Sequence, residues 1–139
     1  IEELYRASQA GVEVKLIVRG MCCLRPGIAG VSENIEVRSI VGRFLEHTRL
    51  YYFHQNGEYS IYLASADLME RNLYRRVEIS FPILDDKLRA RTYKEGLEIY
   101  LKDNCQAWIM NSDGSYTRLQ PQEGEERISA QHYLVEKLG

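Results

Sequence analysis

The run Val-Lys-Leu-Ile-Val-Arg-Gly at residues 14–20 decides the fold class, because its apolar, β-branched residues predict a strand that is largely buried. Residues 2–9 precede it and predict the last turns of a helix, which Gly11 ends. The segment from Gly20 to Gly30 then predicts a loop. A helix, a buried strand and a loop in this order are typical of an α/β domain.

Two hairpins are predicted farther along the chain. Gln55-Asn-Gly57 and Asn111-Ser-Asp-Gly114 each join two strand-like runs, at 50–53 and 59–64 and at 107–110 and 115–119. The other expected elements are a strand at 35–40, a helical turn at 41–46, a strand at 73–81, a helix from Asp85 or Asp86 to about Leu101, and a final helix at 128–138. Because hairpins require antiparallel pairs, the sequence predicts an α/β domain with a mixed sheet flanked by helices.

Composition narrows the class of protein. The 139 residues carry a net charge of −2, with thirteen arginines against five lysines, and arginine grips phosphate or carboxylate oxygens in bidentate fashion. The three cysteines match no zinc spacing and no closed disulfide framework, so we expect no metal site and a reducing, cytoplasmic setting. No apolar stretch reaches membrane-spanning length, and the first residues are no signal peptide. Because the chain begins within a helix, we expect its N-terminus to be a cut inside a longer protein.

Arg19 and His47 are the main candidates for chemistry. Arg19 closes the first strand, where ligands commonly bind in α/β folds, and Arg25 follows in the glycine-rich loop. His47 and Arg49 are two residues apart at the head of a strand, which predicts both side chains on one face. If the strands at 14–20 and 50–53 lie side by side, Arg19 and His47 face one another, which suits phosphate chemistry. The alternatives are that Arg19 caps carbonyls and that His47 is a hydrogen-bonded structural residue.

Further candidates follow the strand at 59–64. Ser65 and Asp67 are expected beside His47, where Asp67 either orients the imidazole or, like Ser65, caps the turn at 68–72. Arg71 belongs to a group of arginines that either pair with carboxylates or line an anion path. Arg38 is expected on the solvated surface.

Six short blocks of sequence in the first hundred residues together form a distinctive pattern. They are Leu4-Tyr5-Arg-Ala-Ser8, Val18-Arg-Gly-Met-Cys-Cys-Leu-Arg-Pro-Gly27, Ser32-Glu-Asn-Ile35, Ser39-Ile-Val-Gly-Arg-Phe-Leu-Glu-His47, Ser65-Ala-Asp67, and Arg71-Asn-Leu73 with Arg75-Arg-Val-Glu78. In this order they resemble the C-terminal domain of bacterial polyphosphate kinase, which implies a phospholipase D-like fold. Residues 1–139 are then a single domain of a larger enzyme, which moves the terminal phosphate of ATP reversibly onto polyphosphate through a phosphohistidine.

The resemblance also implies roles for particular residues. Arg19 and His47 would contact the phosphates of ATP, and His47 is a candidate proton donor; Arg25, Arg49, Ser65, Asp67 and Arg71 are candidate phosphate or polyphosphate contacts. The phosphohistidine and the residues that bind Mg²⁺ would lie in a preceding domain, so the isolated chain is expected to be inactive. Expected partners are ATP or ADP, polyphosphate, the N-terminal domains and further copies of the enzyme, with no nucleic acid. The expected location is cytoplasmic, with a peripheral membrane complex as an option.

Two other functions stay open from the residues. A phospholipase D-like phosphodiesterase pairs two copies of a His-x-Lys-x4-Asp signature, in which Arg49 here replaces the lysine and His54 the aspartate. A non-enzymatic polyanion-binding or oligomerisation module predicts polyphosphate binding that salt weakens and that does not depend on His47.

Overall fold

The computed structural model describes residues 1–139, and their contacts form two compact units. Unit 1 comprises Ile1–Glu46 and Tyr100–Gly139, and unit 2 comprises His47–Ile99.

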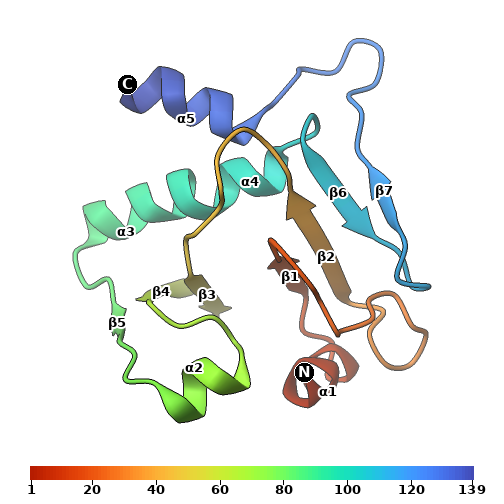
Figure 1. The fold of residues 1–139 in the computed structure, drawn as a ribbon, viewed down its shortest axis with the longest axis vertical. Helices are drawn as coiled ribbons and strands as arrows, with labels where there is room; N and C mark the ends of the chain where they lie inside the picture. The colour runs from red at the N-terminus through yellow and green to blue at the C-terminus, as the bar shows by residue number, and fades with distance from the viewer. The chain divides into compact units, whose positions relative to one another are not determined.

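A four-stranded mixed sheet forms the centre of unit 1, with the strands side by side in the order β1-β2-β6-β7 (Figure 1). The strands are β1 (Val14–Ile17), β2 (Ile35–Ile40), β6 (Ala107–Met110) and β7 (Tyr116–Arg118). β1 runs parallel to β2 with Val14 opposite Ile35, whereas β6 pairs antiparallel with both β2 and β7. The predicted mixed sheet and the second predicted hairpin are therefore confirmed.

Unit 1 also contains helices, of which α1 (Glu2–Gln9) contacts β1. The others are α5 (Ala130–Leu138) and the last residues of α4 (Ile99–Lys102). α1 ends before Gly11, whose φ of 85° places it in the left-handed region that glycine adopts without strain. The core consists of the buried side chains of Leu24, Ile35, Val37 and Met110, against which apolar side chains of α1 and β1 pack.

Unit 2 holds a separate antiparallel sheet in the order β3-β4-β5. Its elements are β3 (Leu50–Gln55), β4 (Glu58–Ala64), α2 (Glu70–Arg75), β5 (Ser80–Pro82), α3 (Asp86–Tyr93) and a π-helical segment, Lys94–Glu98. The predicted hairpin between β3 and β4 is confirmed, with positive φ values of 52° at Asn56 and 82° at Gly57. The predicted cap of α3 is also confirmed, because the Asp85 carboxylate accepts a hydrogen bond from the Leu88 N–H at 2.9 Å.

Three expectations about these elements are wrong. Residues 41–46 form bends instead of a helical turn, and most of 73–81 is not a strand, because α2 runs to Arg75 and β5 covers only Ser80–Pro82. The apolar side chains at 73–81 are exposed, so their alternation does not mark a buried face. The strands at 14–20 and 50–53 do not pair, since β1 pairs with β2 and β3 with β4.

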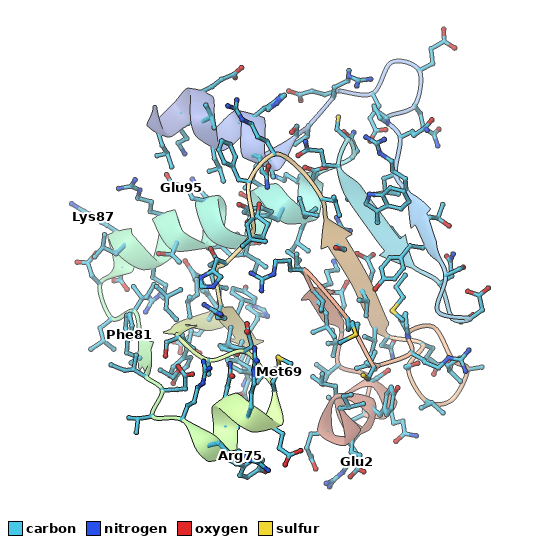
Figure 2. The ribbon with its side chains drawn as sticks, in the orientation of Figure 1. Glu2, Met69, Arg75, Phe81, Lys87 and Glu95 are labelled. Carbon is cyan, nitrogen blue, oxygen red and sulfur yellow. The ribbon has the colours of Figure 1, made fainter.

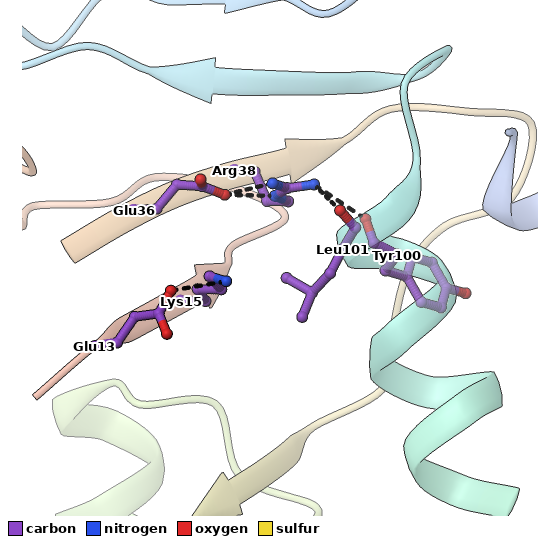
Figure 3. Close-up of polar contacts among 6 residues, drawn as sticks. All are labelled: Glu13, Lys15, Glu36, Arg38, Tyr100 and Leu101. Atoms are coloured by element: carbon purple, nitrogen blue, oxygen red, sulfur yellow. Dashed lines mark hydrogen bonds and ion pairs between the residues drawn. The ribbon is translucent and has the colours of Figure 1, made fainter. Parts of the chain in front are cut away.

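Arg38 is buried in the sheet of unit 1, with 8% of its surface exposed, so the expectation of a solvated position is wrong. Its guanidinium donates to the carbonyl oxygen of Leu101 at 2.6 Å and to that of Tyr100 at 3.5 Å, and it binds the Glu36 carboxylate (Figure 3). The last carbonyl groups of a helix lack partners within that helix. Arg38, which lies on β2, therefore provides hydrogen bonds to the unpaired carbonyl groups at the end of α4.

Candidate functional site

Arg19 lies two residues after β1, and its side chain is exposed. Its Nη1 donates a hydrogen bond of 2.6 Å to the carbonyl oxygen of Glu46, the last residue of unit 1. Arg19 forms no ion pair with a carboxylate. Because a guanidinium carries several N–H donors in a rigid fork, one anchored nitrogen leaves the others free to bind an anion.

His47 and Arg49 meet in unit 2, just before β3 begins at Leu50. Nη1 of Arg49 lies 3.1 Å from Nδ1 of the exposed imidazole, and it also donates to the His47 carbonyl oxygen at 3.2 Å. A guanidinium has no acceptor atom, so Nδ1 must be the acceptor of the first bond. The ring proton of the neutral imidazole is therefore assigned to Nε2.

Asp67 holds Arg49 in turn. Its Oδ1 accepts a hydrogen bond of 2.9 Å from Arg49 Nε, within an ion pair whose arginine side chain is only 17% exposed. This hydrogen bond raises the pKa of Arg49 above its ordinary value. The backbone supports the pairing, since the Ala64 N–H donates to the Arg49 carbonyl at 3.0 Å. A carboxylate, a guanidinium and an imidazole thus form one hydrogen-bonded series, in which Asp67 acts on His47 through Arg49.

Ser65 binds the connecting segment before β5. Its hydroxyl donates to the Glu78 carboxylate and accepts from the Ile79 N–H at 3.0 Å. The N-cap position of α2 is Met69, which makes no side-chain cap bond. Of the two alternatives for Ser65, capping of this turn is therefore not found, and its hydroxyl fixes residues 78–79 instead. Glu78, which was not among the predicted site residues, also favours the charged form of Arg49 electrostatically.

Two other predicted contacts, Arg25 and Arg71, belong to other elements of the chain. Arg25, in unit 1, donates from Nε to the Ser112 carbonyl at 3.0 Å. Arg71 is exposed on α2 and forms no ion pair; Arg75 lies at the C-terminal end of the same helix (Figure 2). Arg19 belongs to unit 1 and His47 to unit 2, so their convergence on one phosphate stays a prediction.

No group of three or more His, Cys, Asp and Glu side chains is arranged to hold a metal ion. None of the helices combines the length and the apolar character that crossing a bilayer requires.

Residues 1–131 match the family described as "Polyphosphate kinase C-terminal domain 2". The polyphosphate kinase of Pseudomonas aeruginosa PAO1 is 59% identical over 138 residues, which are 99% of this chain and 20% of that protein. The polyphosphate kinase of Burkholderia lata is 64% identical over 118 residues, or 85% of this chain and 17% of that protein. The chain thus spans about a fifth of the length of the curated relatives that it matches.

A solved structure agrees with the sequence matches. The crystal structure of polyphosphate kinase from Porphyromonas gingivalis superposes with a TM-score of 0.91 and 42% identity, covering 98% of this chain and 20% of that chain. The α/β, phospholipase D-like fold class predicted from the sequence is confirmed by this match.

Proposed function

Since the chain belongs to the polyphosphate kinase family as its C-terminal domain, we propose that it supplies ATP-phosphate contacts to such a kinase. The reaction is the reversible transfer of the terminal phosphate of ATP onto inorganic polyphosphate through a phosphohistidine. That phosphohistidine lies in the part of the enzyme that precedes this chain, so residues 1–139 alone do not turn over. The partners are ATP or ADP, polyphosphate, the N-terminal domains and further copies of the enzyme, working in the cytoplasm.

The observation that carries the proposal is the fixed orientation of the exposed His47 imidazole. Arg49 holds Nδ1 at 3.1 Å, and Asp67 holds Arg49 at 2.9 Å, so the ring presents Nε2–H as a hydrogen-bond donor. Phosphoryl transfer asks a protein mostly for positioned donors and cations, because charge is spread over the oxygens of the transferred group. A ring locked through its second nitrogen meets that demand.

The hydrogen bond from Arg49 separates two roles of His47. The neutral ring donates a hydrogen bond from Nε2 to a phosphate oxygen without changing its bond to Arg49. A full proton transfer from Nε2 requires that Nδ1 has first taken up a proton, and Nδ1 then no longer accepts from Arg49. We therefore propose hydrogen-bond donation as the resting role of His47, with proton donation only after its bond to Arg49 has opened.

Arg19, which belongs to unit 1, contributes a cation. Its anchor on the Glu46 carbonyl fixes one nitrogen of the fork, and the remaining N–H groups bind phosphate oxygens. The Mg²⁺ expected for the full enzyme would be held by residues outside this chain and would neutralise phosphate charge there.

The test uses the full-length kinase that carries this chain. Arg19→Ala and His47→Ala are each expected to lower ATP-dependent polyphosphate synthesis on the order of 10²- to 10³-fold, the usual effect of removing one such contact. The matched control for Arg19 is Arg118→Ala, because Arg118 is also exposed and also donates to a backbone carbonyl, that of Cys105 at 2.9 Å. Unimpaired synthesis in a folded Arg19 or His47 variant would remove that residue from the mechanism.

A further inference from the structure

Gln131 of helix α5 forms hydrogen bonds to the segment at 41–46. We propose that Gln131 is the residue that positions Arg19. The inference rests on the proposed function of Arg19 and adds a residue that touches neither ATP nor polyphosphate. Gln131 lies in the first turn of α5 and is 3% exposed. A buried side-chain amide needs partners for its oxygen and its nitrogen, and Gln131 finds all of them in this one segment.

The amide of Gln131 clamps Phe44 from both sides. Its Oε1 accepts from the Phe44 N–H at 2.9 Å, and its Nε2 donates to the Phe44 carbonyl at 2.8 Å. Nε2 also donates to the Glu46 carboxylate at 2.6 Å. Three hydrogen bonds therefore fix two residues of a segment that has no helix or strand of its own. The carbonyl that receives Arg19 belongs to Glu46, so the clamp sets the anchor of Arg19 through the Phe44 backbone and the Glu46 side chain.

The shape of the segment is adapted to this amide. A Cβ atom added at Gly42 would collide with Oε1 of Gln131 and lie 2.7 Å from Oε1 of Gln106. Glycine at position 42 therefore leaves the room in which the Gln131 amide reaches Phe44 and Glu46.

The start of α5 is itself fixed. The carboxylate of Asp103 is 1% exposed, and its Oδ2 accepts from the Ala130 N–H at 2.8 Å. Its Oδ1 accepts from the N–H groups of Cys105, Gln106 and Ala107 at 3.0, 2.7 and 3.2 Å. Gln131 follows Ala130 directly, so its amide projects from a helix end that is tied to the sheet of unit 1. A rigid support of this kind is what holding a phosphate-binding guanidinium in place requires.

The role of Arg19 gives the inference its test, in full-length kinase. Gln131→Met keeps the length of the side chain but removes the amide, and we expect about a ten- to hundredfold lower kcat/KM for ATP, because small displacements of a positioned group cost this much. The matched control is Asn104→Leu, since Asn104 is also a buried amide of unit 1 and binds the carbonyl of Glu126 and the N–H of Ile128 instead. We expect Asn104→Leu to lower the melting temperature without changing the KM for ATP.

A double-mutant cycle separates positioning from general damage. If Gln131 acts through Arg19, the Arg19→Ala and Gln131→Met double variant has the kcat/KM for ATP of Arg19→Ala alone. Losses that multiply, or a kcat/KM for Gln131→Met equal to wild type, would overturn the inference while leaving the proposed function intact. Unimpaired synthesis in Arg19→Ala would instead overturn the proposed function. If Gln131→Met does not fold, Gly42→Ala takes its place in the same cycle, because its Cβ displaces the amide, and the same two outcomes decide.

Discussion

Nδ1 of His47 accepts a hydrogen bond of 3.1 Å from Arg49, so a cation occupies the position where many catalytic histidines have a carboxylate. A carboxylate partner stabilises the imidazolium form, whereas an arginine can bind only an unprotonated nitrogen. The hydrogen bond from Arg49 therefore favours a neutral His47 that donates a hydrogen bond over a protonated His47 that acts as a general acid.

Removing the guanidinium should release His47. In the full-length kinase, Arg49→Met is expected to lower kcat by about tenfold or more, because the imidazole then loses its fixed orientation. Arg49→Lys should recover part of the loss, since an ammonium group also donates hydrogen bonds. Steady-state kinetics with ATP check this, and Arg91→Met, which breaks an exposed ion pair with Glu95, is the matched control. Wild-type kcat in Arg49→Met would show that this bond does not position the ring.

Asp103 should be among the most sensitive positions for folding. Asp103→Ala leaves four backbone N–H groups without their acceptor, and the expected loss in the free energy of unfolding is about 3–5 kcal/mol. Asp103→Asn keeps one acceptor oxygen and should lose less. Urea denaturation measures both, with the exposed Asp86→Ala as a control that should change little. Equal stabilities for Asp103→Ala and the control would contradict the assignment.

The raised pKa of Tyr100 should make the free energy of unfolding depend on pH in the alkaline range. Burial, followed by the negative charges of Glu46 and Asp103, raises the pKa of Tyr100 well above its ordinary value of 10.0. Below pH 10 the phenol is neutral in both the folded and the unfolded chain, so its contribution is fully present. As pH rises above 10 the unfolded chain loses the proton first, and the contribution is lost. The difference in unfolding free energy between wild type and Tyr100→Phe should therefore decrease between pH 9 and pH 11; a constant difference would refute this.

The turn at 56–57 gives a local test. Gly57 has a φ of 82°, so Gly57→Ala is expected to reduce the free energy of unfolding by about 1 kcal/mol. Asn56→Gly is the matched control, because position 56 also has a positive φ and glycine adopts it freely. Thermal melts of both variants decide the point, and a Gly57→Ala protein as stable as Asn56→Gly would contradict it.

Elements with local causes could be predicted from the sequence. The Asn-Gly turn requires positive φ values, and Asp85 caps its helix through a residue three positions later, so neighbouring residues suffice to define both. The placement of His47 and Arg49 on one face is equally local, because the two residues are only two positions apart.

Features that depend on residues far apart in the sequence could not be predicted from it. Arg38 is buried because it meets carbonyls 62 and 63 positions later, and Gln131 contacts a segment about 85 positions earlier. No periodicity in one stretch reports such contacts. The prediction of a strand at 73–81 was wrong for another reason. Its apolar residues alternate as in a strand, although α2 extends to Arg75 and the apolar side chains face solvent.

The position of β1 at the edge of its sheet matters for handling the protein. β1 pairs only with β2, so the opposite row of its backbone N–H and C=O groups has no strand partner within this sheet, and such a row can template the addition of a strand from another molecule. Charged side chains usually deter such pairing, but the Lys15 ammonium is neutralised by Glu13 at 2.9 Å (Figure 3). Purified residues 1–139 should therefore aggregate as concentration rises, and substituting Glu13 by lysine would make concentrated samples easier to keep in solution.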